Sequence, residues 1–371
     1  MAETTLQCSE AWRKAGPRRA LLGAAGLLLG ACIVLNLVVN PLGLYWARLF
    51  NPAQLNYRAE KYEFVRQLAE PPATVILGSS RVMTMRSADV EQHLPGPCYN
   101  CTGLGARAED YYAGLRLLCE DAALPIRDIV LGVDYEAFCP GAPVMSEARF
   151  FPAYRKYLIH NRDEGIGFLE RLSLLVANQQ VGEAMNVLRR QLFGHGAGPT
   201  MTVGPGGEAL QPERDEEIAE GRFNLDRILA RRVRKYPEHS LYLSRYAAPD
   251  EVRLAYLDDF LSYCQQRGIR VHAYITPYHP RLWEVLRPLK GIDVLDRVRV
   301  NVAHHFATHG YALADFSHIE SFDGDPGLFY DEVHMTAANQ ARLLEALLGG
   351  QPDAENGGRA GRRGRVERGR G

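Results

Sequence analysis

The chain has little lysine and almost no net charge. Its 371 residues include 5 lysines against 38 arginines, and the 43 basic residues are balanced by 44 acidic ones, which gives a net charge of −1. Proteins that bind nucleic acid present an excess of basic charge to the phosphate backbone, and this composition provides none. We therefore predict no nucleic-acid partner.

The sequence also lacks the motifs that bind nucleotides and metals. It has no G-x-x-x-x-G-K-[ST], and no G-x-G-x-x-G follows a predicted strand, so the known phosphate-binding loops are excluded. The single C-x-x-C pair, Cys98 and Cys101, has no second pair or histidine partner to complete a zinc site. We predict neither a metal nor a diffusible cofactor, and we expect both cysteines to be small buried residues.

One long apolar run is present near the N-terminus. Residues 20–46 are uncharged, which is long enough to cross a bilayer as a helix. Basic residues before such a run favour the cytoplasmic side, and four precede it here: Arg13, Lys14, Arg18 and Arg19. The Arg, Ala and Gly content indicates a bacterial genome rich in GC. We predict a cytoplasmic segment at 1–19, a single-pass anchor at 20–46 in the inner membrane, and an extracytoplasmic, periplasmic domain at 47–348. Lipidation at Cys32 stays open, because "LLLGAC" resembles a lipoprotein cleavage box.

Five short apolar runs predict an α/β fold with a parallel sheet of about five strands. Near-continuous apolar runs indicate parallel strands that are covered on both faces. Helical patterns separate the runs, at about 56–69, 108–120 and 248–267. Ligands of such sheets bind at the carboxyl ends of the strands. The runs are Thr74–Leu77, Cys98–Thr102, Asp128–Asp134, Arg270–Thr276 and Ala312–Phe316.

A long insertion separates the third and fourth predicted strands. It covers about 139–250 and contains a helical pattern at 168–194 and a Gly-Pro-Gly-Gly stretch at 204–207, which predicts a hairpin tip or a mobile lid. Insertions of this size most often cover a site or bind a partner. Residues 349–371 are too polar to bury a core, and we expect them to be disordered.

Two polar motifs follow the first and the last strand. The stretch ATVILGSSRVMT, residues 73–84, ends a buried run in hydroxyls at Ser80, which an ordinary turn also explains. Near the end, GLFYDEVHMT places Asp331 three residues before His334, ahead of a helix that begins near Thr336. A serine nucleophile needs a base within hydrogen-bond reach and a group that fixes the tautomer of that base. The pair of motifs therefore predicts a Ser80–His334–Asp331 triad.

These motifs resemble the first and last sequence blocks of the SGNH (GDSL-like) hydrolases. The resemblance implies a flavodoxin-like three-layer α/β/α sandwich, here with a helical cap formed by the insertion. It assigns the nucleophile to Ser80, the base to His334 and the supporting acid to Asp331, with Ser79 replacing the aspartate of the first block. Together with the anchor, GSSR resembles the membrane-tethered members of bacterial envelopes, which include the D-alanine transfer protein of teichoic acids and the acetylation proteins of alginate and cellulose.

The same resemblance implies donors that hold an oxyanion, and here the sequence departs from the family. The second block supplies a glycine N–H, for which CYNCTGLGARAEDYY offers Gly105 or, as a fallback, Gly103. The third block, usually Gly-x-Asn, reads Gly132 to Asp134. An ionised aspartate accepts hydrogen bonds and cannot donate to an oxyanion, unless burial keeps it protonated. Asn100 is the alternative source of an amide.

Two further polar residues each have two open interpretations. Arg81 follows the nucleophile and either binds an anionic substrate or forms an ion pair inside the protein. His279, with Tyr278 in the stretch ITPYHP, follows the fourth strand and either contacts substrate or packs within a loop.

The sequence thus predicts a membrane-tethered serine esterase or O-acyltransferase that acts on acyl esters of a cell-envelope glycan. Two other classes stay open. One is an inactive accessory subunit that binds a glycan or a membrane acyltransferase, with Asp134 marking a lost oxyanion hole. The other is an anchor whose cap is the working surface.

Overall fold

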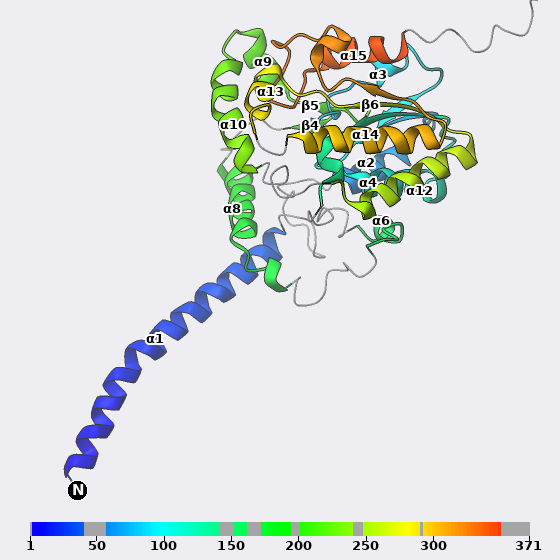
Figure 1. The fold of residues 1–371 in the computed structure, drawn as a ribbon. Coiled ribbons are helices and arrows are strands. Elements are labelled where there is room, and N and C mark those ends of the chain that lie inside the picture. Colours follow the sequence, from blue (N-terminus) through cyan, green and yellow to red (C-terminus); the bar gives the residue numbers. More distant parts are fainter. Residues whose placement is uncertain are drawn as a thin grey trace, which may run out of the picture.

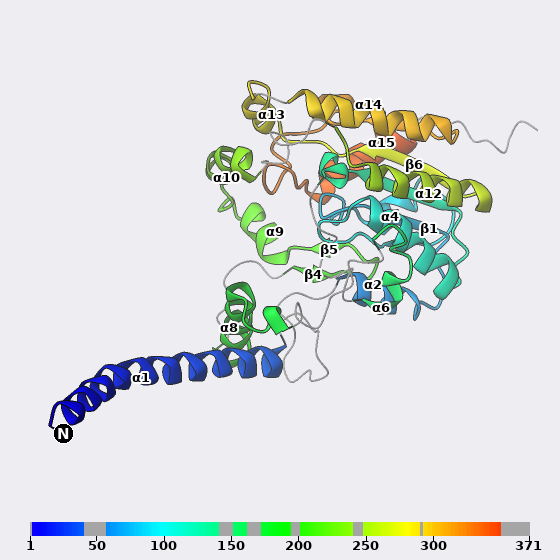
Figure 2. The same ribbon diagram turned by 60° about the horizontal axis from the view of Figure 1, so that its bottom comes forward.

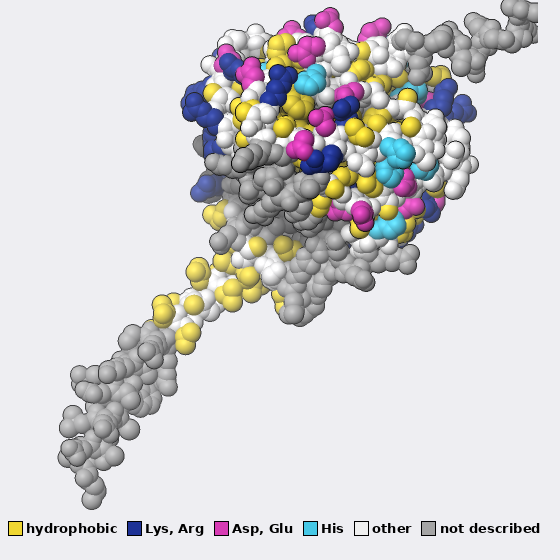
Figure 3. All heavy atoms as spheres, in the orientation of Figure 1, with side chains coloured by type: hydrophobic (Ala, Val, Ile, Leu, Met, Phe, Trp, Pro, Cys, Tyr) yellow, Lys and Arg dark blue, Asp and Glu magenta, His cyan; other side chains and the backbone are white. Residues whose placement is uncertain are grey.

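The computed structural model describes seven parts of the chain: residues 2–40, 57–140, 151–161, 172–193, 201–239, 248–289 and 292–349. They form an α/β domain and one long N-terminal helix, α1 (Ala2–Val39), which projects from the domain (Figure 1). Within α1, residues Ala20–Val39 have a mean hydropathy of 2.4 and are long and apolar enough to cross a membrane. Figure 3 shows hydrophobic side chains along this part of the helix. The rest of the predicted anchor, 41–46, and the tail, 350–371, lie outside the described residues.

A five-stranded parallel sheet forms the centre of the domain, with the strand order β2-β1-β3-β6-β7. Each strand lies within one of the predicted apolar runs, and four of the five end one or two residues earlier than the run. The first residues of β1, β3 and β6 are in register, since Thr74 pairs with Asp128 and Asp128 pairs with Arg270. The carboxyl ends of these strands therefore meet at one edge of the sheet. The bounds are β1 (Thr74–Leu77), β2 (Cys98–Asn100), β3 (Asp128–Val133), β6 (Arg270–Ile275) and β7 (Leu313–Asp315).

Helices cover both faces of this sheet, as the apolar runs require. Side chains of Val75 and Ile129 belong to a core with α2, α4, α12 and α14, whereas those of Ile76 and Val130 belong to a core with α3 and α15. These strand positions alternate because successive side chains of a strand point to opposite faces. The helix bounds are α2 (Tyr57–Val65), α3 (Ser87–Val90), α4 (Ala108–Arg116), α12 (Glu251–Arg267), α13 (Pro280–Leu286), α14 (Asp293–Thr308) and α15 (Ala337–Leu348).

The insertion contributes helices and one hairpin within the described residues. The Gly-Pro-Gly-Gly stretch is the tip of an antiparallel hairpin, as one of its two interpretations predicted. The hairpin packs at the sheet edge, because the Asn100 N–H donates to the Gly206 carbonyl at 2.7 Å and the Ala209 N–H donates to the Met83 carbonyl at 2.7 Å. Its elements are α6 (Pro152–Arg155), α8 (Asn178–Phe193), β4 (Thr202–Val203), β5 (Ala209–Leu210), α9 (Pro212–Ala219) and α10 (Leu225–His239). Helix α8 begins later than predicted, and residues 162–171 lie outside the described part of the chain.

Helices α9 and α10 lie to one side of the sheet, next to α13 (Figures 1 and 2). Contacts between α10 and α13 bring the insertion to the end of the domain where the chain leaves β6. Leu229 and Val233 of α10 are buried in the same core as Leu282 and Leu286 of α13. The insertion therefore packs close to the carboxyl edge of the sheet.

Candidate functional site

The serine motif lies in a tight turn directly after β1. Gly78 has a φ of +141°, and a Cβ on it would come within 2.9 Å of the Gly132 carbonyl oxygen on β3. A Cβ on Gly132 would in turn come within 2.2 Å of Val82 Cγ2. Both positions require glycine because the turn presses against the neighbouring strand. This close packing fixes the position of Ser80.

The D-x-x-H motif folds onto itself before α15. One oxygen of the Asp331 carboxylate accepts the backbone N–H groups of Val333 (3.0 Å) and His334 (2.9 Å). Both carboxylate oxygens lie 2.9 Å from His334 Nδ1. Because a carboxylate only accepts, Nδ1 must carry the ring proton, and Nε2 of the neutral ring is left as an acceptor.

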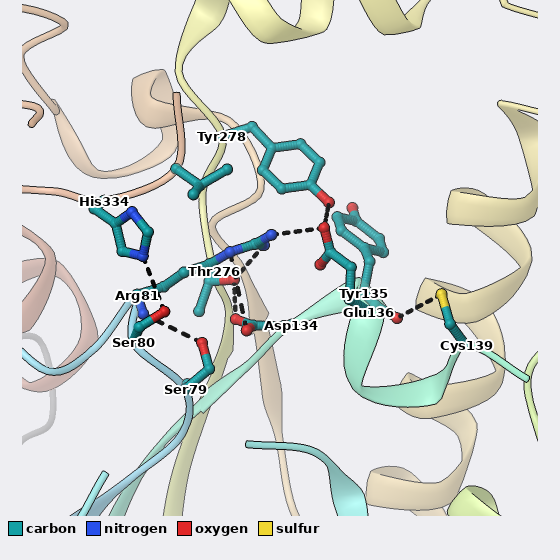
Figure 4. Close-up of polar contacts among 12 residues, drawn as sticks. Ser79, Ser80, Arg81, Asp134, Tyr135, Glu136, Cys139, Thr276, Tyr278 and His334 are labelled. Carbon is teal, nitrogen blue, oxygen red and sulfur yellow. Dashed lines mark hydrogen bonds and ion pairs between the residues drawn. The ribbon is translucent and has the colours of Figure 1, made fainter. Parts of the chain in front are cut away.

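The two motifs meet at Ser80. Its Oγ lies 2.9 Å from His334 Nε2 (Figure 4). With Asp331 on Nδ1 of the same ring, Ser80, His334 and Asp331 form one chain of hydrogen bonds. Two further bonds join the flanking segments: Thr84 Oγ1 donates to the Met335 carbonyl at 2.8 Å, and Gln340 Nε2 donates to the Arg81 carbonyl at 2.6 Å. The structure therefore brings together the three residues that the sequence proposed as a triad.

The environment of Asp331 favours its charged form. Burial raises the pKa of the carboxyl, but the hydrogen bond and charge of His334, the nearby Arg232 and the Val333 N–H lower it by more. The pKa of Asp331 therefore lies well below its usual range, and the carboxylate is ionised at neutral pH.

Arg232, which the sequence analysis did not single out, reaches this carboxylate from the insertion. It lies on α10, with Nη2 3.5 Å from Asp331 Oδ2 and Nε 2.5 Å from Glu332 Oε2. Glu332 is buried, whereas Arg232 is 46% exposed. A cavity of about 450 Å³ opens at the same place, between α10 and Glu332. Its lining residues are Ile228, Arg231, Arg232, Lys235, Tyr236 and Glu332.

Arg81 forms an ion pair inside the protein, which is one of its two open interpretations. The side chain is 8% exposed, and Nη2 donates to Glu136 Oε1 at 2.6 Å. Its Nε lies 3.9 Å from Asp134 Oδ2, and Nη1 donates to Thr276 Oγ1 at 3.3 Å. The guanidinium also lies 4.7 Å from the centre of the Tyr278 ring (Figure 4). Its charge is used to neutralise the protein's own carboxylates.

Glu136 is the centre of this buried cluster. It accepts the hydroxyl hydrogens of Tyr278 (2.8 Å) and Tyr236 (2.5 Å), the latter from α10. Burial raises the pKa of Glu136, but Arg81 and the two tyrosines lower it by more. For Asp134, burial raises the pKa by more than the charge of Arg81 lowers it, so the pKa of this carboxyl lies above its usual value. Glu136 lies two residues after the end of the third predicted strand, and its acidic side chain at that edge of the sheet was the signal in the sequence.

The proposed oxyanion donors require correction. Asn100 does not offer a free amide, because its Nδ2 donates to the carbonyls of Val82 (3.2 Å) and Met85 (2.9 Å) and so braces the turn after Ser80. Asp134 is also engaged inside the protein, since it accepts the Thr276 hydroxyl at 2.6 Å and lies 3.9 Å from Arg81 Nε.

The two glycine candidates differ in whether their N–H groups are engaged. The Gly103 N–H donates to the Gly78 carbonyl at 3.1 Å, so the fallback glycine is occupied. Gly105 lies in the turn after β2 with a φ of +55°, and no acceptor within the described residues takes its N–H. Of these two N–H groups, the one at Gly105 is available to a ligand.

His279 packs within its loop, as one of its two interpretations held. Its Nδ1 accepts the Arg281 N–H at 3.1 Å and caps α13, and its Nε2 donates to the Pro326 carbonyl at 3.2 Å. Burial lowers the pKa of this imidazole, which both bonds hold in a neutral tautomer. Tyr278 is also buried, at 1% exposure.

The cysteines do not form a reactive site in the described residues. Cys98 and Cys101 are free thiols, and burial raises the pKa of Cys101 to about 12. The described parts of the chain contain no group of three His, Cys, Asp or Glu side chains that could hold a metal ion.

Comparisons with known proteins do not assign the chain to a family. No protein-family model matches the sequence, and no curated protein matches it significantly. The function is therefore argued from the side chains that meet at the edge of the sheet.

Proposed function

We propose that this protein is a membrane-tethered, extracytoplasmic serine esterase or O-acyltransferase of the SGNH type, acting on acyl esters of a cell-envelope glycan. The observation that carries the proposal is the Ser80–His334–Asp331 hydrogen-bond chain, with 2.9 Å at each link. The topology supports it: counted along the chain, the five strands have the order 2-1-3-4-5 that flavodoxin-like sheets share. Ser80, at one end of the hydrogen-bond chain, lies in the turn after β1, at the sheet edge where ligands of such sheets bind.

The chemistry would proceed in two displacements. His334 Nε2 accepts the Ser80 proton while Oγ attacks the ester carbonyl carbon, and the backbone N–H groups of Ser80 and Gly105 hold the oxyanion. The carbonyl re-forms, the ester C–O bond breaks, and the departing alcohol takes the proton from His334. Water or a sugar hydroxyl then loses its proton to His334 and attacks the acyl-serine carbonyl. The bond between the acyl carbon and Ser80 Oγ breaks, and Oγ takes the proton back from His334.

The location is proposed from the N-terminal helix. Its apolar span of 20 residues is preceded by basic residues that favour the cytoplasm, so the domain after it would face the periplasm. An outward-facing enzyme tethered there meets envelope glycans first. This step follows the resemblance to envelope SGNH-like proteins.

A fluorophosphonate probe tests the proposal, because it labels only serines that are activated by a base. We expect the full chain in detergent to be labelled, with the adduct on the peptide that contains Ser80. Ser80→Ala should abolish labelling, whereas Ser79→Ala should retain it, since Ser79 Oγ accepts the Arg81 N–H at 3.2 Å and bonds to Asp134 rather than to His334. A labelled Ser80→Ala protein would show that the wrong serine was chosen.

One observation favours the inactive accessory subunit. The two side chains considered as oxyanion donors, Asn100 and Asp134, are both engaged inside the protein. Losing one oxyanion donor lowers the rate by about a hundred- to a thousandfold. If a folded wild-type protein is not labelled, the accessory role becomes the better proposal.

We expect Arg232→Gln to slow labelling by up to about fivefold, because a partly exposed ion pair contributes up to about 1 kcal/mol. The guanidinium helps to hold the Asp331 carboxylate in place. The measurement is the second-order rate of fluorophosphonate labelling. Arg234→Gln, an exposed position on the same helix, is the matched control and should label at the wild-type rate. Equal rates for both variants would leave Arg232 without a role in the triad.

A further inference from the structure

The carboxyl-terminal end of α1 is covered by another part of the chain. Val39 belongs to a small core with Ala184 and Val187 of α8, and Asn36 Nδ2 donates to the Leu175 carbonyl at 2.7 Å. Val39 is 1% exposed and Asn36 is 2% exposed, whereas the leucines between positions 21 and 29 are at least half exposed. Figures 1 and 2 both show α8 beside this end of α1.

These contacts set the depth of residues 172–193, called here the α8 segment, relative to a membrane. A helical span of 20 residues is about 30 Å long, which is the thickness of the hydrocarbon layer. Asn36 lies three residues before the end of the span, about 5 Å inside it. With α1 across the bilayer, the Leu175 carbonyl that binds Asn36 lies at the boundary between acyl chains and headgroups.

Apolar side chains of the α8 segment are exposed at the same depth. Val176 is 36% exposed and directly follows Leu175. Met185 is 42% exposed and directly follows Ala184, which packs against Val39. Each is one residue from a contact with α1, so neither can lie far from the membrane boundary. Leu172, at 42% exposure, extends the same apolar surface.

We propose that the α8 segment is a second membrane contact, in which Leu172, Val176 and Met185 lie among phospholipid acyl chains beside the headgroups. The occupant is lipid because the surface continues from the span itself. Removing such side chains from water is favourable by roughly 25 cal/mol per Å² of apolar area. Two contacts would hold the domain in one orientation above the membrane. This inference does not depend on the proposed chemistry.

The test places an environment-sensitive fluorophore at single positions of the full chain in nanodiscs of phosphatidylethanolamine and phosphatidylglycerol. Val176→Cys and Met185→Cys are labelled with NBD, and the unsubstituted chain gives the background from native thiols. Val300→Cys is the matched control, because Val300 is 59% exposed on α14. We expect blue-shifted emission at 176 and 185, with loss of fluorescence when lipids carry a spin label near the headgroup end of the acyl chain.

NBD at position 300 should emit as it does in water and should not be quenched by the spin-labelled lipids. Emission at 176 and 185 that matches 300 would overturn the proposal and assign the surface to solvent or to a membrane-protein partner. Collisional quenching by iodide provides a second measurement, since it should be weak at 176 and 185 and strong at 300. Circular dichroism of each labelled chain confirms that the substitution leaves the fold intact.

Discussion

Asp331→Asn should lower the rate of Ser80 acylation by about ten-thousand-fold, the scale of this exchange in catalytic triads. The carboxylate accepts from His334 Nδ1 through both oxygens and so keeps Nε2 free to take the serine proton. An amide presents an NH₂ group in place of one oxygen and favours the other tautomer, in which Nε2 carries the proton. The measurement is the second-order rate of fluorophosphonate labelling, compared with wild type.

The fold of the variant is the control for this prediction. The two backbone N–H groups that Asp331 accepts, at Val333 and His334, can still bond to the amide oxygen of asparagine. The melting temperature should therefore change far less than the rate. An Asp331→Asn protein that labels within tenfold of wild type would show that His334 is not oriented by this residue.

Arg81→Met should destabilise the domain by up to about 3 kcal/mol, the lower end of the cost of removing one partner from a buried ion pair, because Glu136 is partly exposed. The substitution leaves Asp134 buried, and Glu136 partly buried at 36% side-chain exposure, without their cation. For a domain of this size such a loss lowers the melting temperature by roughly 10 °C. Thermal unfolding of the full chain, followed by circular dichroism in detergent, measures it.

The stability lost in Arg81→Met should also depend on pH. Without Arg81, burial raises the pKa of both carboxyl groups above their values in the unfolded chain, so the folded state binds more protons. The deficit relative to wild type should therefore shrink as the pH falls from 8 to about 5. Arg297→Met removes an exposed partner of Asp293 and should cost less than about 1 kcal/mol at either pH. A similar loss in both variants would contradict a special role for the buried cluster.

The strands could be predicted from the sequence because a parallel sheet buried on both faces needs continuous apolar runs. Each of the five predicted runs contains one strand of the sheet. The meeting of Ser80 with His334 followed from the same logic, since both motifs lie after strands whose carboxyl ends share an edge.

The contacts of α10 could not be predicted. Its sequence shows which positions form the apolar face, but not which part of the domain that face covers. Packing of Leu229 and Val233 against α13 decides this, and it brings Arg232 to Asp331 and Tyr236 to Glu136. Such long-range placement leaves no local pattern in the chain.

Asn100 shows a second limit of sequence reasoning. A buried turn has carbonyl groups that need donors, and here the Asn100 amide supplies those of Val82 and Met85. An amide beside a candidate nucleophilic serine is equally suited to a ligand or to the backbone of the turn. Only the positions of the neighbouring carbonyls distinguish the two.

The separation of Ser80 and His334 along the chain has a consequence for biosynthesis. The two residues are 254 positions apart, so a ribosome makes the serine long before its base. A serine hydroxyl without an adjacent base is a weak nucleophile. Gln340 of α15 donates a hydrogen bond to the Arg81 carbonyl. Helix α15 must therefore also be in place before the turn that contains Ser80 is held in position. If Ser80 is the nucleophile proposed above, a nascent chain carries it without its base, and reactivity begins only when α15 has docked.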